Sequence, residues 1–142
     1  MSDGLHNSTR APEPVGAYPH ARRVGNLLFL SGVGPRQRGT KQIPGVTLTD
    51  DDEIESYDIT AQTLSVFANV KAILEDAGST WESIVDVTVF LTDMKRDFNV
   101  FNNLYAAHFE HVQACRTTIE VGALPTPIAV ELKVIATIGT QP

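Results

Sequence analysis

The sequence predicts one α+β domain, with two helices packed on one side of a mixed sheet. Its 142 residues with 42% hydrophobic content suffice for a single core and leave little room for a second. Two segments show helical periodicity, and several others alternate between apolar and polar residues or are rich in β-branched ones. Their order along the chain is β-β-α-β-α-β-β, which is typical of a sheet covered by helices.

The first half of the chain contains a predicted hairpin and a long connection. Gly25-Asn26 separates two strand-like runs between residues 21 and 30, as in a hairpin with a two-residue turn. Residues 1–14 are polar, so we expect a flexible N-terminal segment before a single domain at 15–142. Residues 34–55 are polar and contain several prolines and glycines, which predicts a long loop of a kind that is often functional.

Two helices and one strand follow. Asp58 is the expected N-cap of a helix that continues to about Ala77, with Gly78 as its stop. Residues 84–91 are rich in β-branched side chains and predict a strand. A second helix is expected over about 97–111, because its aromatic and leucine residues recur on one stripe.

Two final strands are predicted at 116–121 and 128–138. In the last strand, every second residue from Ile128 to Ile138 is apolar, which predicts a face directed at the core. The other face carries Glu131 and Lys133 among apolar residues. A mixed face of this kind indicates a surface covered by another subunit more than one open to water.

Several classes of function and site are disfavoured. The net charge of −6 provides no basic stripe for nucleic acid. Cys115 is the only cysteine, so an intrachain disulfide and a cysteine zinc site are excluded. His108 and His111 lie three residues apart without a third ligand motif, so we expect no metal. No motif for another cofactor is present, and no apolar run could span a bilayer or direct export, so we expect a cytoplasmic protein.

Glu131 and Arg116 are the main candidate site residues. A carboxylate in the middle of a covered strand must be neutralised or partnered, and Arg116 begins the preceding predicted strand. A structural ion pair and a catalytic pair fit this pattern equally well. Guanidinium is also a rigid two-pronged donor for the carboxylate of an acidic substrate.

Several short motifs, taken together, resemble the Rid family of reactive-intermediate deaminases. The resemblance covers about Val15 to Ile138, and its most specific part is the spacing from Arg116 to Glu131 with Leu124-Pro125 between them. The motifs are Val15-Gly16-Ala17-Tyr18, Ser31-Gly32, Asn69 to Leu74, Asn102-x-x-Tyr105, Arg116 to Val121 and Val130-Glu131-Leu132.

The resemblance implies a chorismate-mutase-like fold and homotrimers, or assemblies of trimers, whose sheets surround a central barrel and whose sites lie between subunits. It implies that Arg116 binds the carboxylate of a small-molecule substrate and that Glu131 positions or activates water, without a cofactor. By the same resemblance, the substrate pocket would be completed by Tyr18, Ser31, Gly32, Asn102 and Thr118.

Two departures from the usual family pattern, Val33 and Thr118, together with the 34–55 insertion, make the chain similar to the 2-aminomuconate deaminase branch. That branch converts 2-aminomuconate to 4-oxalocrotonate and ammonia in the breakdown of aromatic compounds. A general deaminase of 2-imino or enamino acids and a non-catalytic ligand-binding or scaffold protein are the alternatives. A dicarboxylate needs a second cation, and the sequence does not choose among Arg22, Arg23, Arg36, Arg38 and a residue of a neighbouring subunit.

Overall fold

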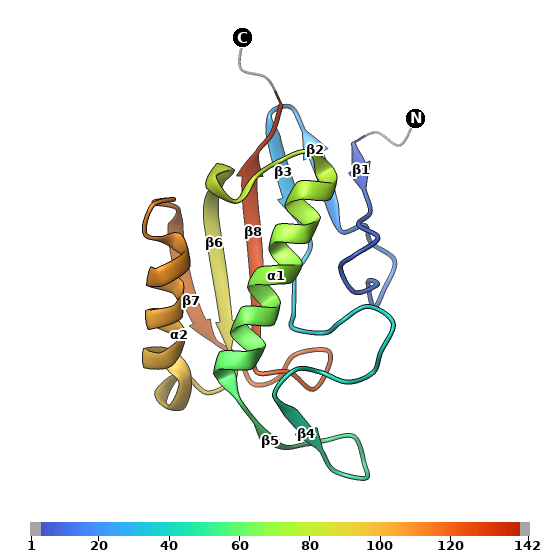
Figure 1. The fold of residues 1–142 in the computed structure, drawn as a ribbon, viewed down its shortest axis with the longest axis vertical. Coiled ribbons are helices and arrows are strands. Elements are labelled where there is room, and N and C mark those ends of the chain that lie inside the picture. Colours follow the sequence, from blue (N-terminus) through green and yellow to red (C-terminus); the bar gives the residue numbers. More distant parts are fainter. Residues whose placement is uncertain (1–3, 140–142) are drawn as a thin grey trace.

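The main sheet has six strands in the order β1-β2-β3-β8-β6-β7 (Figure 1). A computed structural model describes residues 4–139 of the chain. The strands of this sheet are β1 (Leu5–His6), β2 (Ala21–Val24), β3 (Leu27–Leu30), β6 (Ile84–Leu91), β7 (Cys115–Glu120) and β8 (Val130–Thr137). The other elements are β4 (Val46–Leu48), β5 (Ile54–Tyr57), α1 (Ile59–Ala77), a short 3-10 helix (Trp81–Ser83) and α2 (Met94–Phe109).

Both long helices lie on the same side of the sheet (Figure 1). β6 pairs in parallel with β7, whereas β8 is antiparallel to both β6 and β3. The predicted α+β class, with two helices on one side of a mixed sheet, is therefore confirmed. Within residues 4–139, no helix is long and apolar enough to cross a membrane.

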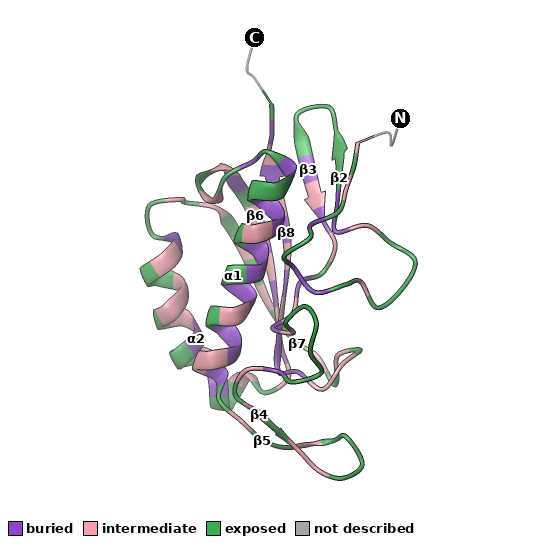
Figure 2. Ribbon diagram, turned by 45° about the vertical axis from the view of Figure 1, so that its right-hand side comes forward, coloured by how far each residue is buried: buried purple, intermediate pink, exposed green. Residues whose placement is uncertain are grey.

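The core lies between the helices and the two central strands. Val87 and Val89 of β6, and Leu132 and Val134 of β8, have no exposed surface. On β8, the residues that alternate with Leu132 and Val134 are only partly buried. The buried side of α1 faces the sheet (Figure 2). The alternation predicted for the last strand is confirmed.

The predicted ends of α1 are confirmed, whereas those of α2 shift. The Asp58 side chain accepts from the amides of Thr60 and Ala61, and Gly78 ends the helix with a φ of 90°, a left-handed conformation that favours glycine. α2 begins at Met94, three residues before the prediction. Its first turn is capped by Asp93, which accepts from Arg96 N, and polar caps of this kind lie outside the apolar stripe on which the prediction rested.

The long polar connection contains a small hairpin that the sequence did not predict. β4 and β5 pair antiparallel within it, near the ends of the sheet where β6 and β7 finish (Figure 1). The Tyr57 hydroxyl donates to Asp97 over 2.6 Å, and the Arg96 guanidinium lies 4.0 Å from the Tyr57 ring centroid. These contacts anchor the hairpin to the first turn of α2.

The described part of the N-terminal segment is packed against the domain. β1 pairs with β2, Ser8 is 3% exposed and Ala11 is fully buried. Arg10 forms an ion pair with Asp76 of α1 over 2.7 Å. The sequence led us to expect a flexible segment at 1–14, because this segment shows no apolar periodicity that would reveal its contacts with the domain. Residues 1–3 of this segment lie outside the described residues.

We expect Tyr57→Phe to lower the free energy of unfolding by about 1–3 kcal/mol, because the substitution removes a hydrogen-bond donor from a buried carboxylate. Asp97 is only 1% exposed, and burial raises the pKa of its carboxyl. Urea unfolding followed by circular dichroism measures the change. Tyr18→Phe is the matched control, since Tyr18 is 42% exposed; equal stability of the two variants would contradict the anchoring role of Tyr57.

Candidate functional site

Arg116 and Glu131 lie on opposite faces of the sheet. Arg116 is in register with Val87, a residue buried under the helices, and paired residues in a sheet point to the same side. Glu131 is in register with Phe90 and alternates with the buried residues of β8. β6 also separates the two strands. A direct ion pair between Arg116 and Glu131 within one chain, which the sequence left open, is therefore wrong.

Arg116 is held by two aromatic rings of α2. Its guanidinium carbon lies 4.6 Å from the ring centroid of Tyr105 and 5.9 Å from that of Phe98. The side chain is half-buried, yet it has no hydrogen bond or ion pair with any residue from 4 to 139. Stacking fixes the planar fork and leaves its donors free for an anion.

Two other predicted residues lie near Arg116. Thr118 is two positions further along β7 on the same face and lines a hollow with Phe98 of α2. Asn102 is half-buried and lies one helical turn from Phe98 and from Tyr105, on the same stripe. We call Arg116, Thr118 and Asn102 the arginine half-site.

Glu131 and the remaining predicted residues form a second group, which we call the glutamate half-site. Tyr18, Ser31 and Gly32 line one small hollow. Gly32 lies directly against Glu131, since a Cβ at position 32 would overlap the Oε2 atom of this carboxylate. The isolated bridge between Val33 and Leu132 brings the two segments together, and a side chain at position 32 would displace the carboxylate from its place.

Glu131 is a partly desolvated carboxylate. Burial raises the pKa of its carboxyl, and the positive charge of Arg36 acts in the opposite direction. No residue from 4 to 139 donates a hydrogen bond to it. Lys133, two residues further along the same face, donates to the carbonyl of Leu30, and burial lowers the pKa of its amine. A partly buried carboxylate with a raised pKa is a candidate for general acid–base chemistry.

Three polar residues of α1 support the glutamate half-site, and sequence reasoning missed this role. Asn69 donates to the carbonyls of Gly34 over 2.9 Å and of Arg36 over 2.7 Å. Ser65 donates to Pro35 O over 2.8 Å, and Gln62 accepts from Ala129 N over 2.8 Å. The available signal was a set of polar residues spaced three and four apart on the buried side of an otherwise apolar helix.

One chain does not enclose a substrate at this site. The hollow lined by Tyr18, Ser31 and Gly32 holds only about 30 Å³, and Glu131 is not among its lining residues. Sites for small organic ligands usually measure about 300–1,000 Å³. The arrangement can supply an anion-binding guanidinium and a proton-transferring carboxylate, but a second surface must close over the carboxylate.

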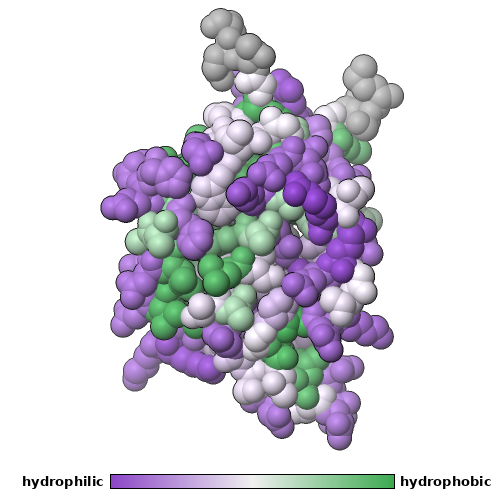
Figure 3. Space-filling model, viewed as in Figure 1, coloured by the Kyte–Doolittle hydropathy of each residue, from purple (hydrophilic) through white to green (hydrophobic). Residues whose placement is uncertain are grey.

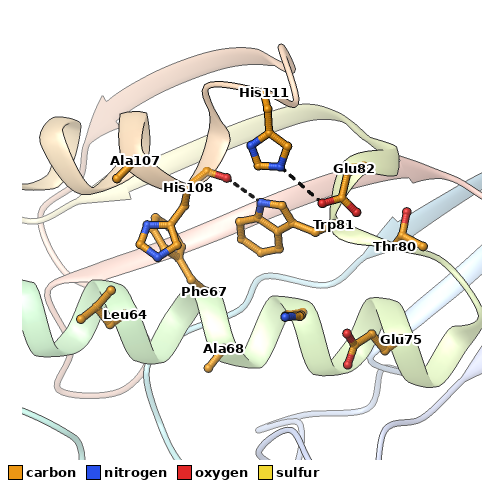
Figure 4. A pocket seen from close by; sticks show the side chains of 11 residues that line it. Leu64, Phe67, Ala68, Glu75, Thr80, Trp81, Glu82, Ala107, His108 and His111 are labelled. Atoms are coloured by element: carbon orange, nitrogen blue, oxygen red, sulfur yellow. Dashed lines mark hydrogen bonds and ion pairs between the residues drawn. The ribbon is translucent and has the colours of Figure 1, made fainter.

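The histidines of α2 and the turn after it lie elsewhere, in a groove between α1 and α2 of about 640 Å³. Figure 4 shows His111 pointing toward Glu82, 3.3 Å from its Oε2 atom, and Trp81 donating to the His108 carbonyl. Apolar surface gathers in the same region of the helical face, at the lower left of Figure 3. Within the described part of the chain, no cluster of three His, Cys, Asp or Glu residues could hold a metal ion.

Comparisons with known proteins give one consistent result. The family model described as endoribonuclease L-PSP matches residues 8–138. A RutC family protein of Pyrococcus horikoshii is 40% identical over 89% of this chain and 90% of its own length. The crystal structure of YyfA, a Rid family protein of Yersinia pestis, has a TM-score of 0.80 at 31% identity, covering 94% of this chain and 98% of its own. TdcF of Escherichia coli, solved with bound serine, has a TM-score of 0.79 at 30% identity over 95% and 98% of the two chains.

We expect Asn69→Ala to lower the free energy of unfolding by about 1–3 kcal/mol, because two backbone carbonyls lose their donor. Amide hydrogen exchange around residues 34–36 should also become faster, since Asn69 is 8% exposed and holds this segment. Asn103→Ala, at an exposed position of α2, is the control and should be neutral or slightly stabilising. Unchanged exchange in the Asn69 variant would count against the supporting role.

Proposed function

This chain belongs to the Rid family, and on that premise we propose that it is an enamine and imine deaminase whose substrate is 2-aminomuconate. The observation that carries the proposal is Arg116, a half-buried guanidinium stacked on Tyr105 without any acceptor among residues 4–139. A cation held in this way is preorganised for a carboxylate. The serine bound to TdcF is an amino acid and supports a carboxylate ligand.

The proposed reaction is hydrolytic and needs no redox step. The enamine is protonated at carbon to give the imine, water adds to the C=N carbon, and the resulting carbinolamine expels ammonia to leave the keto acid 4-oxalocrotonate. Arg116 binds the carboxylate beside the reacting carbon and thereby reduces the entropic cost of positioning. Glu131 takes a proton from the attacking water and then delivers one to the departing nitrogen.

The other predicted residues shape the pocket in this proposal. Ser31 donates a hydrogen bond from its hydroxyl to Pro19 O over 2.7 Å. The hydroxyl oxygen can still accept a hydrogen bond from a substrate. Gly32 gives the Glu131 carboxylate the room it needs. Tyr18 at one half-site, and Asn102 and Thr118 at the other, line the two sides of the substrate.

The proposed site forms between two copies of the chain in a homotrimer, or in an assembly of trimers. Arg116 lies on β7, which is the edge strand of the sheet, and Glu131 lies on the face away from the helices. A neighbouring copy can therefore bring its arginine half-site against the glutamate half-site of the first. The 42% exposure of Ile119, an apolar residue of β7 opposite Phe90, supports the covering of this face.

Three other functions of the same fold are separable by experiment. A general deaminase of imino acids would show no preference for the dicarboxylate, and a binding or scaffold protein would never release ammonia. The family description also contains the word endoribonuclease, but the net charge of −6 gives RNA no basic track along this chain.

We expect Arg116→Ala to reduce kcat/KM for ammonia release by about 100-fold or more, through loss of the charge-assisted hydrogen bonds to the carboxylate. Glu131→Gln should reduce kcat by about 10²–10⁴-fold, because the amide cannot transfer the proton. The measurement is ammonia release from freshly generated 2-aminomuconate by the purified, assembled protein. Lys95→Ala, which removes another cation near the arginine half-site, is the control; wild-type rates in all variants would remove the mechanism.

The two inactive variants should complement each other. If a site takes Arg116 from one copy and Glu131 from the next, random mixing of equal amounts of Arg116→Ala and Glu131→Gln chains leaves about a quarter of all sites intact, and about a third of the sites in trimers that contain both variants. Subunits are mixed by co-expression with two different tags, and ammonia release is measured on doubly tagged protein, for which about a third of the wild-type rate is expected. Activity no higher than that of the separate variants would place both residues in one subunit's site and contradict the proposal.

A further inference from the structure

We propose that Arg36 binds the distal carboxylate of a dicarboxylate substrate and so determines the specificity of this site. The inference rests on the proposed deaminase function, which it extends by assigning the second anion-binding group. The glutamate half-site, the free guanidinium of Arg36 and the anchoring of its backbone carry the argument.

Arg36 lies at the glutamate half-site. It lines the same small hollow as Tyr18, Ser31 and Gly32. It is also the one side chain whose positive charge acts on the pKa of the Glu131 carboxyl. Glu131 does not itself line this hollow, but Gly32 does and also lies against the Glu131 carboxylate, so Gly32 connects Arg36 with the carboxylate.

The guanidinium of Arg36 is largely unused. Within residues 4–139 its only hydrogen bond is from Nη2 to the backbone carbonyl of Glu13, over 2.8 Å, and no carboxylate forms an ion pair with it. An arginine has five N–H donors, so several remain for an anion.

The other candidate arginines are engaged or lie elsewhere. Arg38 donates to the carbonyls of Ala11 and Ser8 over 2.8 and 2.9 Å, and its guanidinium lies 3.6 Å from the Glu13 carboxylate. Arg23 lies at the β2–β3 turn, where it donates to Gly25 O, and it does not line the hollow. Arg22 lies on β2 in register with Leu5 and Phe29, away from the hollow. Of the four, the geometry points to Arg36.

The backbone of Arg36 is fixed, whereas its guanidinium forms only one hydrogen bond among residues 4–139. Asn69 binds the carbonyls of Gly34 and Arg36, and Ser65 binds that of Pro35. These three hydrogen bonds from α1 hold the segment in place. A cation on a rigid base loses little conformational entropy when an anion binds, which favours affinity and selectivity.

Two guanidinium groups would then define the substrate. Arg116 of a neighbouring copy binds the carboxylate beside the reacting carbon, Arg36 binds the carboxylate at the far end, and Glu131 lies between them. A monocarboxylate leaves Arg36 without a partner and loses these charge-assisted hydrogen bonds. The site therefore favours a dicarboxylic enamine or imine over a short monocarboxylic one.

The test compares Arg36→Gln with wild type on freshly generated 2-aminomuconate and on a short monocarboxylic 2-imino acid. We expect the ratio of kcat/KM for the dicarboxylate to kcat/KM for the monocarboxylate to fall by about 10- to 100-fold, since a hydrogen bond to a charged group is lost. Arg22→Gln is the matched control and should keep the wild-type ratio. An unchanged ratio in the Arg36 variant overturns the assignment.

A binding measurement separates this inference from the proposed activity. Calorimetry on the assembled protein compares adipate, an unreactive six-carbon dicarboxylate, with hexanoate. We expect wild type to prefer adipate and Arg36→Gln to lose that preference. Absence of ammonia release from every substrate would refute the deaminase alone, whereas equal binding of adipate and hexanoate by wild type, or no binding of adipate, would refute the role of Arg36.

Discussion

The hydrogen bonds from the buried side of α1 are the constraint on which the candidate site depends. Gln62 and Asn69 are 0% and 8% exposed, and they bind backbone groups of two segments: Ala129 N, just before β8, and two carbonyls of the 34–36 segment. Buried backbone groups need such partners. The polar side chains of α1 therefore allow the 34–36 segment and the residue before β8 to pack against this helix. The same bonds that stabilise the fold therefore set the position of Arg36 relative to Glu131.

A second constraint is the alternation of side chains along a strand. Because Arg116 shares the helix-facing side with Val87 and Glu131 shares the opposite side with Phe90, no side-chain movement within one chain brings them together around a substrate. In the proposed function the two groups therefore act together only across two copies. Contact with the Tyr105 ring would then hold the cation at an edge strand without an internal counter-ion among residues 4–139.

The sequence predicted the helices and the main strands because each carries its own period, and it selected Arg116 and Glu131 by their chemistry. It could not show that β6 separates β7 from β8, because strand order is a long-range property that adjacent positions in the chain do not reveal. It also missed β4 and β5. β2 and β3 are as short, but Gly25-Asn26 marks the turn between them, whereas no such turn dipeptide lies between β4 and β5. The choice of Arg36 among four arginines required knowing which guanidinium groups were already engaged.

A site shared between copies links catalysis to assembly. In the proposed arrangement Arg116 and Glu131 come from different copies, so a substrate bound at both half-sites would contact two subunits at once. A ligand that binds only the assembled state stabilises that state by mass action. Substrate would therefore favour association, and dissociation would abolish activity while every residue of both half-sites remains chemically intact. In that arrangement two copies together would form a substrate pocket that neither copy provides alone.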